Sequence, residues 1–391
     1  MKNIYPVLRM FSVTLVLFVM AGIASLGFSA HIAHAGGTGW SVVPSANVSP
    51  VENSLQSVAA LSTNKVWAVG YSVQGATKST LVKRTLVEHY NGTIWQVVTS
   101  PDVGTGDNVL TGVSALSANN VWAVGYTPLG ALTLHYNGAG WHLVPAPAAC
   151  QFNAVTAITS NDVWAVGTMS YRGCAEHYNG TSWNLVTTPV MGKSDNTLLS
   201  VAASSSHDVW AVGNYCIGDG CDRGGGSFQT MILHYIGGRW SVVPSPNPSP
   251  YANQLNAVTV ISATDAWAVG ASQTNPMTGS TLIVHYDGIS WTQVVSPGVN
   301  SRSVLTGIAS VSATDMFAVG SSTSPTHEMV TLIEHFDGTT WSIVASPSPG
   351  NGAVLNGLTH VADAPLGTAQ FWAVGSYSTN TSGSTLTERD I

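Results

Sequence analysis

The sequence predicts an all-β fold in which one four-stranded unit recurs seven times, and two observations support this. The first is a pentapeptide related to Val-Trp-Ala-Val-Gly, which occurs at residues 66–70, 121–125, 163–167, 209–213, 266–270, 316–320 and 371–375. The second is the spacing between consecutive copies, which is 42 to 57 residues. A regular repeat of this length is typical of one supersecondary unit stacked on itself, and four short strands per repeat describe the blade of a β-propeller.

Each unit contains four expected strands, A to D, in a fixed order. Strand A is a Leu-x-x-Val run such as residues 55–58, and a short polar turn links it to strand B, the pentapeptide, which ends at its Gly. Strand C is a run such as residues 86–90, after which Asn91-Gly92 suits the positive φ angles of a type I′ hairpin turn. Strand D begins at a second Trp and ends at a Pro, which cannot continue a central strand.

The two ends of the chain predict how the ring closes. The last unit stops just after its strand C, whereas residues 38–45 read as a strand D with no preceding strands. We therefore expect residues 386–389 to pair with residues 40–43, which removes exposed sheet edges. This gives a seven-bladed, single-domain propeller over residues 36–391, with blades at about 55–101, 110–147, 152–189, 198–246, 255–297, 305–347 and 355–391 plus 38–45.

Residues 1–35 are interpreted as a signal peptide. Lys2 and Arg9 give a positive start, an apolar run follows to about residue 30, and Ala33-His34-Ala35 has the small-x-small pattern of a cleavage site. The run is long for a signal peptide, so a retained membrane anchor stays open as the alternative. We favour cleavage after Ala35, export to the outside or surface of the cell, and no membrane span in the mature chain.

The four cysteines fit an exported protein, because disulfides persist in oxidising compartments. Their clustering most simply pairs Cys150 with Cys174 and Cys216 with Cys221. A metal site is the competing interpretation, but the spacings match no zinc motif. Asp219 and Asp222 lie near the second pair, but their spacing fits no calcium loop. We therefore expect neither a metal nor a cofactor.

The charge balance argues against nucleic-acid binding. The chain has 12 Lys and Arg against 19 Asp and Glu, a net charge of -7, and Lys83-Arg84 is its only adjacent basic pair. A phosphate backbone requires a basic patch, which this distribution does not supply. The sequence carries no sign of oligomerisation, so we expect a monomer.

With these repeats the chain resembles secreted bacterial propellers with kelch-type or Asp-box-type blades. The kelch resemblance is a Gly that ends strand B, then an aromatic residue, then a Trp on strand D, although kelch blades have a Gly pair. The Asp-box resemblance lies at 287–291 and 337–341, where Asp-Gly precedes the Trp, and Asn replaces that Asp at Asn91, Asn137 and Asn179. The resemblance implies the fold and leaves function open, because such propellers include enzymes and binding scaffolds.

The loops between strands B and C and between strands D and A vary most in length, and both kinds lie on one face. We predict the binding site on this face. Its candidate ligand-binding residues are Asn53, Asn108, Asn196, Asn253, Tyr71, Tyr126, Tyr215 and Arg302, with Tyr377 nearby. An amide ring with tyrosines suits sugar hydroxyls and rings. The structural alternative is that each Asn bonds its own backbone in the turn into strand A.

Residues that occupy every unit cannot mark one unique site. All 13 Trp and six of the 12 His are of this kind, so we interpret the Trp as packing residues and expect each His to bond the turn between strands A and B. No catalytic residue is assigned, because the loop acids Asp107, Asp195, Asp219, Asp222 and Glu328 fall on different blades.

Three functions are compatible with these patterns. We favour a non-catalytic propeller that binds a glycan or a protein through its variable loop face. The alternatives are a polysaccharide-active hydrolase or lyase, and a structural cell-surface protein.

Overall fold

The computed structural model describes residues 39–390 except 148, 193, 219–220, 222–225, 276–277, 300–301, 363 and 366–369. The predicted signal peptide at 1–35 and the acids Asp219 and Asp222 lie outside the described residues. In the part of the chain that is described, no helix has the length and apolar character needed to cross a membrane.

The described residues form 28 strands and one short 3-10 helix, η1 (Lys78–Thr80), and contain no α-helix. The strands of the first half are β1 (Trp40–Val42), β2 (Glu52–Ser62), β3 (Lys65–Gln74), β4 (Val82–Tyr90), β5 (Trp95–Val97), β6 (Val109–Ser117), β7 (Asn120–Thr127), β8 (Gly130–Tyr136), β9 (Trp141–Leu143), β10 (Gln151–Thr159), β11 (Asp162–Met169), β12 (Arg172–Tyr178), β13 (Trp183–Val186) and β14 (Ser194–Ser205). Those of the second half are β15 (Asp208–Gly218), β16 (Gly226–Ile236), β17 (Arg239–Val242), β18 (Ala252–Ser262), β19 (Asp265–Asn275), β20 (Thr278–Tyr286), β21 (Trp291–Val294), β22 (Ser303–Ser312), β23 (Asp315–Thr323), β24 (Met329–Phe336), β25 (Trp341–Val344), β26 (Gly352–His360), β27 (Phe371–Ser378) and β28 (Gly383–Asp390).

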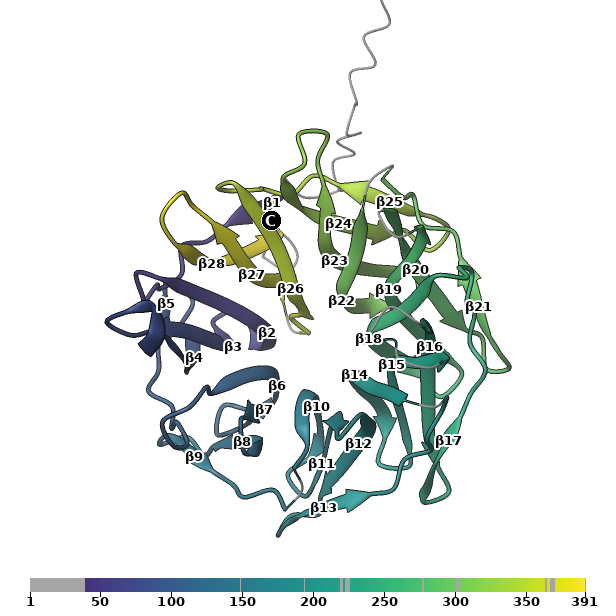
Figure 1. Ribbon diagram of the computed structural model, residues 1–391, viewed down its shortest axis with the longest axis horizontal. Coiled ribbons are helices and arrows are strands. Elements are labelled where there is room, and N and C mark those ends of the chain that lie inside the picture. Colours follow the sequence, from purple (N-terminus) through teal and green to yellow (C-terminus); the bar gives the residue numbers. More distant parts are fainter. Residues whose placement is uncertain are drawn as a thin grey trace, which may run out of the picture.

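These strands form six sheets arranged around a central opening (Figure 1). Five sheets have four antiparallel strands each: β2–β5, β6–β9, β10–β13, β22–β25, and β26, β27, β28 with β1. The sixth has eight strands, because the parallel pair Phe228 and Ala252 joins β16 to β18. The repeats predict that every four-stranded unit forms a separate sheet. The structure differs here, because two units are joined into one sheet.

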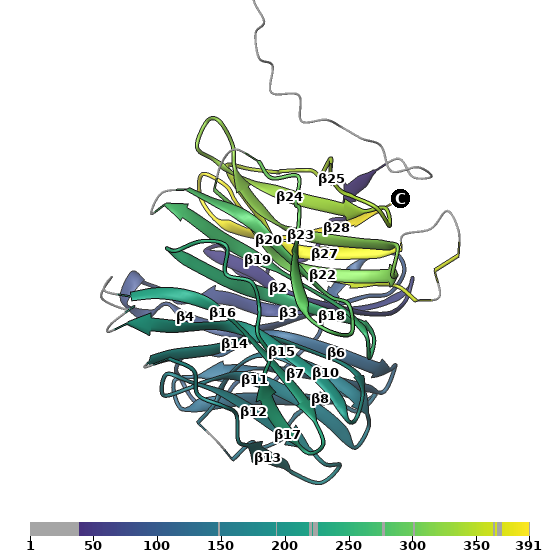
Figure 2. The same cartoon turned by 90° about the vertical axis from the view of Figure 1, so that its right-hand side faces the viewer.

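The innermost strand of each unit faces the opening, and the short outer strands lie at the rim (Figure 1). In the side view, the strands run from one face of the ring to the other (Figure 2). The connections from B to C and from D to A therefore lie together on one face, called here the loop face. The other two kinds of turn lie on the opposite face.

The predicted closure of the ring is confirmed. β1 pairs antiparallel with β28, in the register Trp40 with Asp390, Ser41 with Arg389 and Val42 with Glu388. The Val43 N–H continues this ladder by donating to the Thr387 carbonyl at 2.9 Å. The N-terminal strand thus supplies the outer strand of the last sheet.

The repeated Trp residues pack neighbouring units against one another, as the sequence indicated. Each strand B Trp meets the strand D Trp of the next unit edge to face; Trp67 and Trp141, for example, have ring centroids 5.4 Å apart at 86°. Such edge contacts add to the free energy gained from burying the rings. The constant positions of the two Trp within the repeat are therefore a packing requirement.

The Gly that ends each strand B is required by close approach of the backbone. A Cβ on Gly70 would lie 1.9 Å from the Ser54 carbonyl oxygen on the paired strand, and the same contact recurs in the other six units. Only Gly permits this approach without moving the strand.

The predicted bond of the repeat His is present in five of the six units that have this His: its partner is the Asp at the start of strand B in four of them and Asn120 for His135. The unit of His89 has Lys65 at the position of that Asp. His177 Nε2 lies 2.8 Å from Asp162 Oδ1, and the matching distances are 2.6 Å for His234 with Asp208 and 2.9 Å for His285 with Asp265 and His335 with Asp315. The predicted disulfides, Cys150–Cys174 and Cys216–Cys221, are also present and suit an oxidising environment.

Candidate functional site

The opening at the centre of the ring is a channel of about 410 Å³ lined by three consecutive residues from each innermost strand, such as 56–58 of β2. Each of these strands has a bulge at this point, as between Leu55 and Ser57. Several lining side chains cap the neighbouring strand: the amide nitrogens of Asn153 and Asn356 donate at 2.8 Å to the carbonyls of Leu198 and Leu55. All the lining side chains are uncharged, so the channel lining itself offers no acid–base pair.

The four predicted asparagines are buried and bonded within their own loops. Asn53, Asn108 and Asn253 are 0% exposed and Asn196 is 1% exposed. The Asn53 Oδ1 accepts the Ser49 N–H at 2.9 Å, and its Nδ2 donates back to the Ser49 carbonyl at 2.7 Å. The equivalent oxygens of Asn108, Asn196 and Asn253 accept the N–H groups of Val103, Met191 and Ser249. These bonds favour the structural interpretation, in which the amides shape the D–A loops.

The predicted tyrosines separate into two pairs. Tyr215 and Tyr377 pack against hydrophobic clusters and contact Gly192 and Gly350 of the preceding loops. Tyr71 and Tyr126 belong to neighbouring sheets and are half-buried beside ionisable side chains. The sequence reasoning grouped all four, although one signal distinguishes them: the first pair lies two residues after the repeat Gly and the second pair one residue after it.

Tyr71 is the centre of a cluster formed with Glu52, Lys83, Asp107 and Tyr126, called here the Tyr71 cluster. The Tyr71 hydroxyl donates to Glu52 Oε1 at 2.7 Å, and the Lys83 ammonium lies 4.1 Å from the Tyr71 ring centroid. The backbone N–H of Lys83 donates to Asp107 Oδ1 at 2.9 Å. The cluster thus combines two aromatic rings, two carboxylates and one ammonium group.

Burial and the nearby carboxylates keep both phenols neutral. Burial and then the hydrogen bond to Glu52 raise the pKa of Tyr71 well above its usual value. Burial and then the charge of Asp107 raise the pKa of Tyr126. Loss of a phenolic proton is disfavoured where negative charge already exists and water is excluded.

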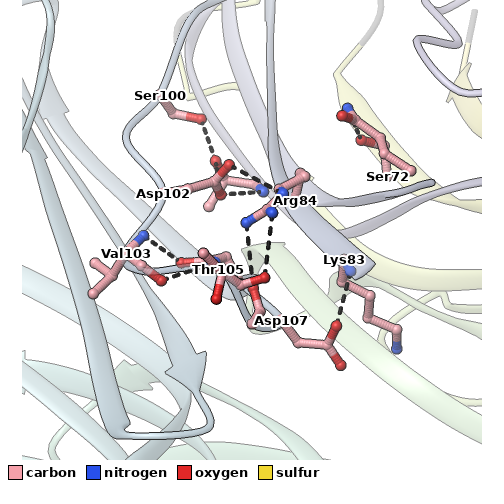
Figure 3. A network of polar contacts seen from close by, with 12 residues as sticks. Ser72, Lys83, Arg84, Ser100, Asp102, Val103, Thr105 and Asp107 are labelled. Carbon is pink, nitrogen blue, oxygen red and sulfur yellow. Dashed lines mark hydrogen bonds and ion pairs between the residues drawn. The ribbon is translucent and has the colours of Figure 1, made fainter. Parts of the chain in front are cut away.

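The loop at 101–108 is fixed against β4 beside this cluster (Figure 3). The Arg84 guanidinium donates to the carbonyls of Thr105 and Gly106 at 3.3 Å each, and its Nε lies 3.9 Å from Asp102 Oδ2. Asp102 Oδ1 accepts the Thr85 N–H at 3.0 Å. Arg84 is therefore engaged with this loop, whereas the Lys83 ammonium lies over the Tyr71 ring.

The remaining predicted residues are not brought to this cluster. Arg302 precedes β22, Glu328 precedes β24, and Asp195 lies in β14 of another sheet. Across the described ranges, no group of three His, Cys, Asp or Glu side chains is placed to hold a metal ion.

Comparison with known proteins identifies the fold. No family model and no curated protein matches the chain. Among solved structures, YCF48 from Cyanidioschyzon merolae aligns with a TM-score of 0.55 at 16% identity over 90% of this chain and 98% of that one. YCF48 bound to D1 peptide gives 0.56 at 13% identity, covering 90% and 96%, and streptogramin B lyase gives 0.53 at 10% identity, covering 92% and 99%. These neighbours are β-propellers, and at such identities the likeness shows the fold alone.

Proposed function

We propose that the mature chain is an exported, seven-bladed β-propeller with kelch-like or Asp-box-like repeats, formed by residues 36–391 after removal of residues 1–35. The blade count is supported by the eight-stranded sheet, which consists of two antiparallel sets of four strands connected by the parallel pair Phe228 and Ala252. Dividing it there gives seven sets of four strands.

The function we propose is non-catalytic binding of an extracellular ligand at the Tyr71 cluster on the loop face. The observation that carries this proposal is that Tyr71 and Tyr126, from two sheets, interact electrostatically, with Glu52 and Lys83 at the first ring and the charge of Asp107 acting on the second. Tyr215 and Tyr377, which lie one residue further along their strands, pack against the core instead. Aromatic side chains with polar groups at their edges are typical of binding surfaces.

A glycan suits this combination of groups best. Sugar rings present apolar faces that pack on tyrosine, and their hydroxyls donate to carboxylate oxygens and accept from an ammonium. The buried asparagines contribute indirectly, because they fix the loops that carry Asp107 and Glu52. The chemistry requires no proton transfer, so no turnover is expected.

A protein segment is the second candidate. One structural neighbour is described as bound to a peptide, which supports the capacity of a propeller to bind one. The exposed side chains Leu129 and Tyr171, 83% and 67% exposed on neighbouring sheets of the loop face, would add apolar contact area for such a partner.

A glycan array probed with residues 36–391 tests the first candidate. We expect binding to a subset of neutral oligosaccharides, without cleavage of the bound sugars, and a loss of roughly tenfold or more in affinity on Asp107→Asn with Glu52→Gln. Glu328→Gln is the matched control, because it removes an exposed loop-face carboxylate in another sheet. Equal losses in both variants, or sugar cleavage that depends on one loop acid, would contradict the proposal.

A further inference from the structure

Four glutamates occupy one repeat position, the residue before the repeat His or its replacement. They are Glu88, Glu176, Glu334 and Glu388, and each is 0% exposed. The same position holds apolar side chains in the other three units, namely Leu134, Leu233 and Val284, which are also 0% exposed. The fold therefore accepts an apolar side chain here, and the glutamates are not required for packing.

Two of these glutamates contact or flank the N-terminal segment that closes the ring. Glu88 Oε2 accepts the Ala46 N–H at 3.3 Å. Glu388 pairs directly with Val42 of β1, and its Oε2 accepts the Ser346 hydroxyl at 2.9 Å. Glu334 makes an equivalent bond, since its carboxylate accepts the Ser296 hydroxyl at 3.0 and 3.1 Å, but its strand pairs with Ile343 instead of with the closing segment.

The closing segment, residues 40–47, is short, and it is held by strand pairing, by bonds to Thr385 and Thr387 and by hydrophobic packing of Trp40 and Val43. β1 contributes three residue pairs to β28. Beyond β1, the Ser45 and Thr385 hydroxyls lie 2.7 Å apart and Asn47 Oδ1 accepts the Thr385 N–H at 2.9 Å. Trp40 packs edge to face on Phe317 of the neighbouring sheet, with centroids 5.7 Å apart.

The surroundings of both carboxyls favour the protonated form. Glu88 lies between Ala68 and Val97 in its sheet, and Glu388 lies between Ala373 and Val42. Burial raises the pKa of each to about 8, and the hydrogen bonds from Ala46 and Ser346 only partly oppose it.

The charged groups that share these interfaces are engaged elsewhere. The Arg389 guanidinium lies 3.5 Å from the Tyr90 hydroxyl and 5.8 Å from the Trp372 ring centroid. Asp390 accepts the N–H groups of Gln370 and Phe371 at 2.8 and 2.6 Å. The Arg389 guanidinium is thus directed to aromatic side chains, and Asp390 carries the same sign of charge as an ionised glutamate. A buried charge without a partner of opposite charge is costly.

We propose that Glu88 and Glu388 form a proton-dependent latch on the closing segment. While both carboxyls hold their protons, residues 40–47 stay docked between β28 and β4. When the protons leave to solvent, undocking of the segment lets water reach both carboxylates, so the seam of the ring opens while the other sheets remain folded.

Hydrogen exchange of residues 40–47 in the mature chain between pH 5 and 9 tests the latch. The pKa of each carboxyl is higher while the segment is docked than after it is released. Between these two pKa values, each carboxyl lowers the protection factor of residues 40–47 roughly tenfold for every unit by which the pH rises. We therefore expect protection, corrected for intrinsic exchange, to fall by up to about a hundredfold per unit below pH 8. The combined variant Glu88→Leu with Glu388→Leu, which copies Leu134 and Leu233, should abolish this dependence.

Glu334→Leu is the matched control, and the pH dependence at residues 40–47 should survive it because Glu334 does not contact the segment. If the double variant does not fold, Glu388→Gln alone keeps the side-chain shape and should halve the slope on a logarithmic scale. A wild-type segment whose corrected protection does not change with pH, or a control that flattens the response, would overturn the latch.

Discussion

Tyr71 and Tyr215 lie at adjacent positions of the same strand in two repeats, and they have different surroundings. Tyr71 follows its Gly directly and lies among Glu52, Lys83 and Asp107. Tyr215 lies one residue further along its strand and packs in the cluster that contains Met231 and Leu233. Successive side chains of a strand point to opposite faces, so a shift of one residue decides between core and site. The comparison teaches that a one-residue difference after the repeat Gly places one tyrosine among charged groups and the other in a hydrophobic cluster.

The Gly that precedes these tyrosines sets the register for both regions, so its replacement should have the largest effect. Gly70→Ala places a Cβ 1.9 Å from the Ser54 oxygen and Gly213→Ala does the same at Thr197. We expect each to lower the free energy of unfolding by about 3 kcal/mol or more, as measured by urea denaturation. Gly104→Ala is a useful contrast, because its Cβ has no neighbour within 4 Å. A similar loss at Gly104 would show that backbone strain at a positive φ, rather than contact, controls stability.

Replacement of each tyrosine by Ala should give the next largest effect, and the loss of stability should differ between the two. Tyr215→Ala removes a ring that packs against the core and Gly192, and we expect a loss of about 2–3 kcal/mol in the free energy of unfolding. Tyr71→Ala removes a half-buried ring outside the hydrophobic clusters, and we expect about 1 kcal/mol. Both values come from the same denaturation experiment. Equal losses would mean that the two rings play the same structural part.

Removal of the disulfide beside Tyr215 should have a smaller effect on stability and no effect on ligand binding at the Tyr71 cluster. Cys216→Ser with Cys221→Ser opens a loop with a sequence separation of 5, and the chain-entropy account predicts a loss of about 2 kcal/mol. Ligand affinity at the Tyr71 cluster should not change, because β15 lies in a different sheet. Weaker binding in this variant would indicate that the site extends across the loop face.

The smallest expected effect is electrostatic. Asp107→Asn removes the charge that raises the pKa of Tyr126, so this pKa should move down toward its usual value near 10. A phenol with a raised pKa in the folded state is neutral at higher pH and loses stability as pH rises above 10, so the variant should resist alkaline pH slightly better. Carbon-13 NMR titration of labelled tyrosine measures the shift, with Asp102→Asn as the control. If the pKa of Tyr126 does not change in the Asp107→Asn variant, the charge of Asp107 does not act on Tyr126 and the proposed cluster is wrong at this residue.

The fold was predictable because the repeats act as an internal alignment. The pairing of β1 with β28 was predicted because the last repeat stops after its strand C, whereas residues 38–45 read as a strand D with no strands A to C before it. The pairing of Cys150 with Cys174 followed from proximity in the chain. The junction of β16 with β18 was not predictable, since it depends on one parallel contact between Phe228 and Ala252 that carries no repeat signal.

The site was predictable only in part. Asn53 and its equivalents fit both a turn and a ligand contact, and their burial was needed to favour the turn. The sequence grouped Tyr71 and Tyr126 with Tyr215 and Tyr377, and their separation depends on which face of the sheet each ring occupies. The burial of Glu88 could be inferred from the sequence, because it lies two residues after Leu86 and therefore on the same face of the strand. Its contact with Ala46 could not, because that contact depends on ring closure.

Binding measured side by side for two double variants tests the central claim most directly. The ligand is the neutral oligosaccharide that the wild-type mature chain binds most tightly on the array, and its affinity is measured by titration calorimetry. Tyr71→Ala with Tyr126→Ala should weaken binding at least tenfold, whereas Tyr215→Phe with Tyr377→Phe, which keeps the packed rings, should bind like the wild type. The reverse order of affinities, or equal affinities, would contradict a site at the Tyr71 cluster.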